Sequence, residues 1–191
     1  LALLAVCALH RPLARASLGA GLATFGVAAV WIGAAVDHSL LPWALGFVVV
    51  VAALHAAFPF VQERLEPGLD ARRWSALFPP LGLILLLIPL AQLGDAGWWL
   101  WPVVLVLDLF ALAAAALTRL LAALVGALLL TLVVLGVAIA QLPAGFAGGG
   151  RELFLVAAFA VFFCAGALWL LRRCGGRPGV DAPDWSAYLP D

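Results

Sequence analysis

The sequence predicts an all-α fold, a polytopic transmembrane helical bundle with six full spans after a truncated first helix. Of its 191 residues, 66% are hydrophobic and 10% are charged, and the mean hydropathy is +1.18. Soluble domains are about 45–50% apolar and about 25% charged, and a soluble chain of this length could not keep so much apolar surface from water. The apolar residues also gather into runs of about 20, the length at which a helix crosses the hydrocarbon of a bilayer.

These runs predict one transmembrane helical domain, residues 1–171, followed by a polar cytoplasmic tail, residues 172–191. Segments 83–88 and 103–107 are apolar at every position, a pattern that favours helices over the alternating strands of an outer-membrane barrel. The chain starts inside an apolar run and contains no Met, so we expect a first helix that is cut short and a longer parent chain. The predicted spans are residues 1–9, 18–36, 41–61, 74–93, 98–118, 120–142 and 153–171.

The span predicted at residues 74–93 contains Pro79 and Pro80 near its start. Proline removes a backbone donor and kinks or breaks a helix, although membrane helices tolerate it where neighbours satisfy the freed groups. Two interpretations stay open. The helix begins late, near Phe78, which leaves about 24 Å at about 1.5 Å per residue, or it is broken at the prolines, as in some transporter sites.

The arginines predict the orientation of the chain, because basic residues in short loops mark the cytoplasmic side. Counted across alternate loops, nine of the ten arginines fall on one side, and only Arg151, followed by Glu152, falls on the other. We therefore expect the Leu1 end outside and the tail in the cytoplasm of a bacterial inner membrane. The nine are Arg11, Arg15, Arg64, Arg72, Arg73, Arg119, Arg172, Arg173 and Arg177.

Asp108 is the first candidate intramembrane polar site. It lies at the centre of the span at 98–118, ten residues from Trp98 and eleven from Arg119. An ionised carboxylate at mid-bilayer costs about 2.5–3.5 kcal/mol on insertion scales, so such residues usually face a bundle interior or a cavity. Asp108 is either a proton-relay or ion-site carboxylate or, as we favour, a hydrogen-bonded group that holds two helices together.

His55 is the second candidate intramembrane polar site. It lies six residues before Val61, and so nearer the cytoplasmic side than Asp108 by about 7–8 Å at about 1.5 Å per residue. Direct pairing with Asp108 would need helix tilt or an intervening water. Because no other metal ligand stands three or four residues further along, we favour a histidine that is satisfied between helices.

Asp37, His38 and Asp95 are candidate polar residues of the outer face. They lie just before predicted spans, where Ser39 and Asp95 offer good N-cap chemistry, so we favour capping over catalysis. The isolated polar residues within or beside the spans are expected to serve helix packing: Gln92, Gln141 and Thr131.

The sequence gives no reason to expect a catalytic site, a metal site, a cofactor or nucleic acid as a ligand. Cys7, Cys164 and Cys174 are too few and too scattered for a disulfide framework, and they form no C-x-x-C motif. Ten basic and ten acidic residues do not provide the basic face that nucleic acid requires. The expected partners are the lipid bilayer and further helices, either of the same parent chain or of partner membrane subunits.

One stretch resembles a known family. The residues Ala53-Leu54-His55-Ala56-Ala57-Phe58-Pro59-Phe60 lead into an arginine-containing loop, and Leu-, Ala- and Trp-rich helices follow at short spacing. In these features the chain resembles the large bacterial multi-spanning proteins grouped as "domain of unknown function 2339". The resemblance implies many more spans than this chain holds and no established activity, so it assigns no functional residue.

Three functions are weighed on these observations. The favoured one is a structural or assembly module of a larger envelope protein, since polar groups within the spans are sparse. The alternative is a proton- or ion-coupled transporter component that uses Asp108 and possibly His55. A membrane enzyme acting on a lipid-linked substrate ranks last, because it would need a cluster of acids, histidines or arginines at one surface.

Overall fold

The structure, a computed structural model, describes residues 16–65, 75–93, 98–118, 121–141 and 149–173, and every regular element within them is an α-helix. This confirms the all-α prediction for that part of the chain. The predicted truncated helix at 1–9 and nearly all of the predicted tail lie outside the described residues. The helices are α2 (Ala16–Ala35), α3 (Leu41–Leu65), α5 (Phe78–Leu93), α6 (Leu100–Thr118), α7 (Leu121–Ala140) and α8 (Gly149–Arg173).

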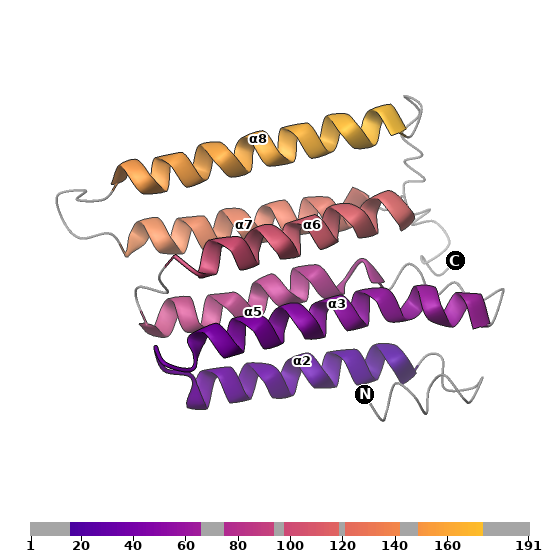
Figure 1. Cartoon of the computed structure of the whole chain (residues 1–191), viewed down its shortest axis with the longest axis horizontal. Helices are drawn as coiled ribbons and strands as arrows, with labels where there is room; N and C mark the ends of the chain where they lie inside the picture. The colour runs from indigo at the N-terminus through magenta and orange to yellow at the C-terminus, as the bar shows by residue number, and fades with distance from the viewer. Residues whose placement is uncertain (1–15, 66–74, 94–97, 119–120, 142–148, 174–191) are drawn as a thin grey trace, which may run out of the picture.

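The six helices lie side by side with roughly parallel axes, and each runs in the opposite direction to the one before it (Figure 1). α5 is the central helix, since it packs against α2, α3, α6 and α7. α2 and α8 form the two edges of the bundle, and α8 packs against α7 (Figure 1). The alternating directions are those expected when successive helices are joined by short connections.

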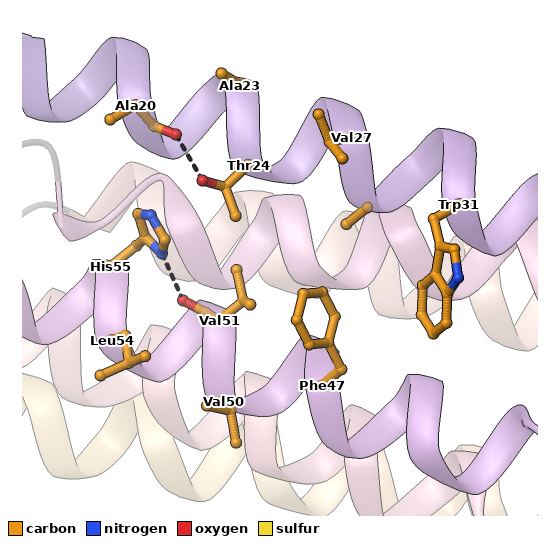
Figure 2. Close-up of a pocket in the computed structure, with 11 residues that line it drawn as sticks. Ala20, Ala23, Thr24, Val27, Trp31, Phe47, Val50, Val51, Leu54 and His55 are labelled. Carbon is orange, nitrogen blue, oxygen red and sulfur yellow. Dashed lines mark hydrogen bonds between the residues drawn. The ribbon is translucent and has the colours of Figure 1, made fainter. Parts of the chain in front are cut away.

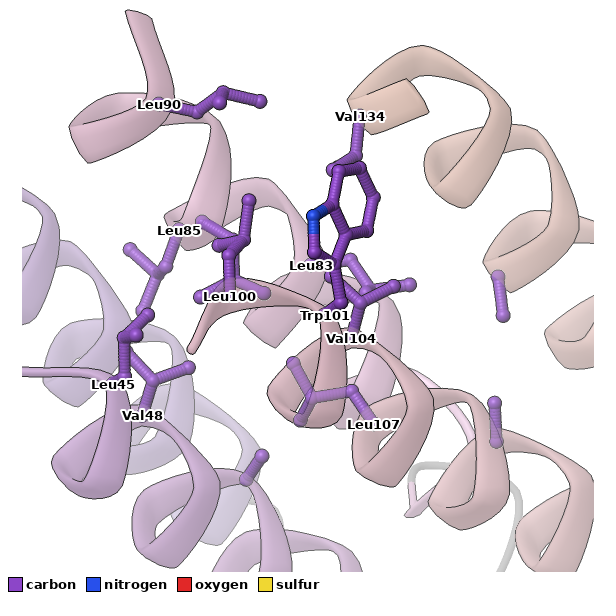
Figure 3. Close-up of a cluster of buried hydrophobic side chains, with 14 of the residues drawn as sticks. Leu45, Val48, Leu83, Leu85, Leu90, Leu100, Trp101, Val104, Leu107 and Val134 are labelled. Carbon is purple, nitrogen blue, oxygen red and sulfur yellow. The ribbon is translucent and has the colours of Figure 1, made fainter. Parts of the chain in front are cut away.

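The core lies where α3, α5, α6 and α7 meet (Figure 3). Leu83 of α5 and Val104 and Leu107 of α6 have no exposed surface. A Cβ atom on Gly82 would lie 3.0 Å from Cδ2 of Leu107 and 3.5 Å from Cβ of Ala52, so this glycine lets α5 approach both α6 and α3 closely. Small residues at such contacts are typical of helix packing in membranes, where backbones must come near one another.

The outside of the bundle is covered by large apolar side chains. Val30 of α2 is 73% exposed, and Leu153 and Val161 of α8 are 72% and 68% exposed. Monomeric soluble proteins rarely expose extensive apolar surface, whereas hydrocarbon tails cover such a surface without cost. The exterior therefore fits a bilayer.

Four helices, α2, α3, α6 and α8, are long and apolar enough to cross a membrane by length and composition. The other two apolar helices are shorter: α5 has 16 residues, and the apolar stretch of α7 is Leu124–Ala140. Six full spans were predicted, and the structure supports four of them on these criteria. The difference at α5 arises because the helix begins at Phe78 instead of residue 74.

The start of α5 answers the question raised by its prolines. Residues 76–77 form a turn, and α5 begins at Phe78, so Pro79 and Pro80 lie in its first turn, where the missing N–H groups have no intrahelical partner to lose. α5 therefore begins late, as the first interpretation states, and Ser75 before the turn is also helical. Pro89 and, in α3, Pro59 lie inside helices.

Helix boundaries differ from the predicted ones at several further ends. α3 continues through Pro59 to Leu65, four residues beyond the predicted end at 61. α6 begins at Leu100 instead of 98, which places Pro102 in its first turn, a position that proline tolerates. α8 begins at Gly149, within the segment predicted as a glycine-rich loop.

Candidate functional site

Asp108 is fully buried between α6 and α7. The residue has no exposed surface, and the hydroxyl oxygen of Thr131 lies 2.9 Å from its Oδ1 and 2.9 Å from its Oδ2. Thr131 is 1% exposed. The pair therefore forms a hydrogen-bonded link between two helices inside the core.

The sequence places this pair through the packing faces of the two helices. Asp108 continues the buried stripe of α6 that includes Val104, Leu107 and Ala111, at the i, i+3, i+4 and i+7 positions of one helix face. Thr131 lies between Ala127 and Val134 on the buried side of α7. The two polar side chains meet because both interrupt apolar stripes at the same level of the bundle.

The geometry at Asp108 has a chemical consequence. The Thr131 hydroxyl carries one hydrogen, so it can donate to only one carboxylate oxygen at a time. A neutral carboxyl group uses both short contacts, because one oxygen accepts from the hydroxyl and the other donates to it. The site is therefore complete as a neutral pair of side chains that joins two helices.

His55 occupies a different part of the bundle. The residue is 6% exposed, and its Nδ1 lies 2.8 Å from the carbonyl oxygen of Val51 on the same helix. Its ring packs against Phe25 of α2 and Phe78 of α5, with centroid separations of 5.9 Å and 5.3 Å. His55 is thus held by its own helix and by two aromatic rings.

The structure does not join His55 to Asp108. The partner of Asp108 is a hydroxyl on α7, whereas His55 bonds to α3 and packs against rings of α2 and α5. Among the described residues, no three side chains of His, Cys, Asp or Glu are grouped so that they could hold a metal ion. The two polar residues are therefore held by different partners on different helices.

Asp37 caps the start of α3. Its Oδ1 accepts hydrogen bonds from the backbone N–H groups of Ser39 and Leu40, at 3.0 and 2.9 Å, and from the Ser39 hydroxyl at 2.7 Å. These bonds hold the pKa of Asp37 below its ordinary value, the hydroxyl of Ser39 contributing most. The N-cap is therefore Asp37, whereas Ser39 was predicted. His38 is exposed, and Asp95 lies outside the described residues.

Two glutamines tie the helices together near their ends. Nε2 of Gln92 donates to the carbonyl oxygen of Gly33 at 2.9 Å, and Nε2 of Gln141 donates to that of Leu90 at 3.0 Å. These bonds connect α5 to α2, and the residue after α7 to α5. They bear out the packing role that was predicted for the isolated glutamines.

The start of α8 adds a polar group that the sequence did not single out. Oε2 of Glu152 is buried and has no hydrogen-bond partner among the described residues. Its Oε1 lies 3.9 Å from Nε of Arg151, whose guanidinium stands 5.3 Å from the ring centroid of Trp98. The signal in the sequence is that Glu152 precedes Leu155 and Phe159 on the buried face of α8.

Comparison of the chain with family models, curated proteins and solved structures finds no match. The arrangement of residues described above is therefore the basis for a functional assignment.

Proposed function

We propose that this chain is a structural or assembly module of a larger bacterial envelope protein, embedded in the inner membrane and without chemistry of its own. In this proposal all six described helices cross the bilayer. The helix axes are roughly parallel, so that the helices run side by side in one common direction or its reverse, and this supports the proposal (Figure 1). The shorter α5 lies at the centre, where other helices surround it.

The observation that carries the proposal is the pairing of Asp108 with Thr131. A carboxylate that moves protons or ions needs a path for water or a second titratable group. Asp108 has no exposed surface, and its hydrogen bonds go to the hydroxyl of Thr131. Three grooves on the described part of the bundle are lined by other residues.

The partners in this proposal are bilayer lipids and further helices, from the parent chain or from partner subunits. The edges formed by α2 and α8 expose large apolar side chains such as Val30 and Val161. Lipid tails or another apolar helix can cover these surfaces equally well, because helix association in membranes depends on packing and not on exclusion of water.

The proposed orientation places the Leu1 end outside and the C-terminal end in the cytoplasm. Arg64 and Arg172 stand near the ends of α3 and α8, which lie at the same side of the bundle, and Arg151 stands at the opposite side, at the start of α8 (Figure 1). Short loops rich in arginine remain on the cytoplasmic side.

The test separates the structural role from proton transport. The chain and its Asp108→Asn variant are reconstituted into liposomes that contain a pH-sensitive dye, and an electrical potential is imposed across the membrane. We expect both proteins to give the same proton flux as empty liposomes, because the amide oxygen of the variant still accepts the Thr131 hydrogen bond. A flux that appears with the natural chain and vanishes in a folded Asp108→Asn variant would establish the transporter alternative instead. Thr131→Ser, which keeps the hydroxyl, serves as the control for folding.

A further inference from the structure

A groove of about 640 Å³ runs between α2 and α3 (Figure 2). It exists because α2 packs mainly against α5 and makes few contacts with α3. Its lining extends along α2 from Ala20 to Trp31, a rise of about 16 Å at about 1.5 Å per residue. The volume lies within the usual range for small-molecule sites, about 300–1,000 Å³.

One end of the groove contains a histidine nitrogen that has no hydrogen-bond partner among the described residues. Nδ1 of His55 stands 2.8 Å from the Val51 carbonyl oxygen, which can only accept, so Nδ1 carries the hydrogen. In the neutral ring, Nε2 is then an acceptor. Figure 2 shows Nε2 on the side of the ring nearer α2, and no described residue is hydrogen-bonded to it.

A second polar atom that lines the groove, on the opposite wall, is also an acceptor. The hydroxyl of Thr24 donates its only hydrogen to the Ala20 carbonyl oxygen at 2.7 Å, so its remaining capacity is to accept. Thr24 and His55 face each other across the groove (Figure 2). The hydrogens of His55 and Thr24 go to backbone carbonyl oxygens. The other donor among the lining side chains is the indole N–H of Trp31, seven residues beyond Thr24 on α2.

We propose that this groove binds a neutral, membrane-dissolved amphiphile whose head carries a hydroxyl group and donates a hydrogen bond to His55. A head that only accepts hydrogen bonds, such as a quinone carbonyl or an ether, would face these two acceptors and form a hydrogen bond with neither. A charged phosphate head is disfavoured because no charged residue lines the groove and charge within hydrocarbon is costly.

The rest of the groove fits the tail of such a molecule. Its walls beyond Thr24 are apolar and include Val27, Phe47 and Val50. Val27 and Val50 are 70% and 55% exposed, so the groove opens sideways to the bilayer, and a ligand can enter from the lipid phase. The hydroxyl head would lie at the level of His55, with the apolar tail directed toward Trp31.

The first test varies the ligand and leaves the protein unchanged. The chain in nanodiscs is titrated with a radiolabelled alkyl hydroquinone under argon, and competition is measured with its dimethyl ether and with an alkanol of the same tail length. We expect saturable binding that exceeds partition into empty nanodiscs, with the ether at least tenfold weaker. An alkanol that competes equally assigns the site to hydroxyl amphiphiles in general, and a weaker alkanol assigns it to phenolic heads. Equal affinity for hydroquinone and ether, or binding no greater than in empty nanodiscs, overturns the proposal.

The second test varies the protein. His55→Phe keeps a ring against Phe25 and Phe78 and removes the acceptor, so we expect hydroquinone binding to weaken about tenfold, the effect of losing one hydrogen bond, with binding of the ether unchanged. Should this variant fail to fold, Thr24→Val removes the other acceptor, and we expect it to weaken hydroquinone binding by a smaller factor. Thr118→Val is the matched control, because Thr118 also donates to a carbonyl oxygen four residues back but lies on α6, away from the groove. Unchanged affinity in both folded groove variants would contradict the assignment.

Discussion

The hydroxyl oxygen of Thr131 lies 2.9 Å from each carboxylate oxygen of Asp108, so one side chain of α7 serves both oxygens of the buried acid on α6. Both residues are within 1% of complete burial. In this environment neither group can turn to water if the other is removed, and this makes the pair sensitive to loss of one partner.

A double-mutant cycle measures the strength of this link. Thr131→Val removes the hydroxyl but keeps the shape, and we expect the free energy of unfolding in bicelles to fall by about 1–3 kcal/mol, the cost of an unsatisfied buried polar group. The double variant Asp108→Leu, Thr131→Val should recover part of this loss, with a coupling energy of about 0.6–1.7 kcal/mol, as for hydrogen bonds between membrane helices. Thr131→Ser is the control and should stay close to the natural chain. Additive effects of the two single substitutions would show that the pair does not interact.

A second prediction concerns Gly21, where α2 lies close to Phe78 and His55. A Cβ atom at this position would lie 2.7 Å from Cζ of Phe78 and 3.0 Å from Cδ2 of His55. We expect Gly21→Ala to lower the free energy of unfolding by about 1–3 kcal/mol through overpacking, and the melting temperature in detergent to fall with it.

Gly26 on the same helix provides the matched control for Gly21. A Cβ atom there would meet nothing within 4 Å, so Gly26→Ala should be neutral or stabilise by up to about 1 kcal/mol, because alanine loses less backbone entropy on folding. Equal effects of the two substitutions would mean that α2 does not pack against Phe78 and His55 as described.

The sequence predicted the helices well because apolar runs of about 20 residues have few alternatives in a bilayer. The Asp108–Thr131 pair could also have been anticipated. Asp108 stands eleven residues before Arg119 and Thr131 twelve residues after it, so a hairpin that turns at Arg119 brings both to one depth. Taken alone, as one of several isolated polar residues, Thr131 gives no sign of this partner.

Other features could not be predicted from the sequence alone. The groove beside His55 depends on the separation of α2 from α3. This separation is set by the packing of α2 on α5, through contacts such as those near Gly21. The cap of α3 was assigned to Ser39 because serine and aspartate have nearly equal N-cap preference. Only the geometry shows that Asp37 accepts both backbone bonds.

A third prediction tests that cap. Asp37→Ala removes the acceptor for two backbone N–H groups, so we expect faster amide hydrogen exchange in the first turn of α3 and a lower melting temperature. His38→Ala is the control, since His38 is exposed and its imidazole is not part of the cap. Protection of the first turn that is the same in the Asp37→Ala variant and in the natural chain would contradict the capping role.

The cap also predicts a dependence on pH. Because its hydrogen bonds lower the pKa of Asp37 from its ordinary value of 3.8, the ionised form stabilises the folded state. This contribution is fully present above the ordinary pKa and is lost as the pH falls through the lower, folded-state value. Protection of the first-turn amides, relative to the intrinsic exchange rate at each pH, should therefore fall below about pH 4 in the natural chain. Asp37→Asn, which still caps but does not titrate, should show no such step.

The last prediction concerns the direction of the chain in the membrane. In a background where every native cysteine is replaced by serine, Arg64→Cys and Arg151→Cys place single thiols near opposite ends of the bundle, on α3 and α8. Both arginines are exposed, so both thiols can react. A membrane-impermeant maleimide added to intact cells should label Arg151→Cys alone, because loops rich in arginine remain in the cytoplasm.

Permeabilising the cells should then expose Arg64→Cys to the same reagent, and Arg172→Cys should follow Arg64→Cys because α3 and α8 end at the same side of the bundle (Figure 1). The pattern distinguishes three cases. Labelling of Arg64→Cys and Arg172→Cys from outside, with Arg151→Cys protected, reverses the orientation but keeps the alternation of the helices. If α5, α6, α7 and α8 all cross the bilayer, the chain crosses it four times after α3, so Arg64 and Arg172 lie on the same side. Labelling of one of the variants Arg64→Cys and Arg172→Cys from outside, without the other, would therefore show that not all four helices cross. The shorter helix α5 would then be the first candidate for a helix that does not cross, since its 16 residues give about 24 Å at about 1.5 Å per residue against a hydrocarbon core of about 30 Å.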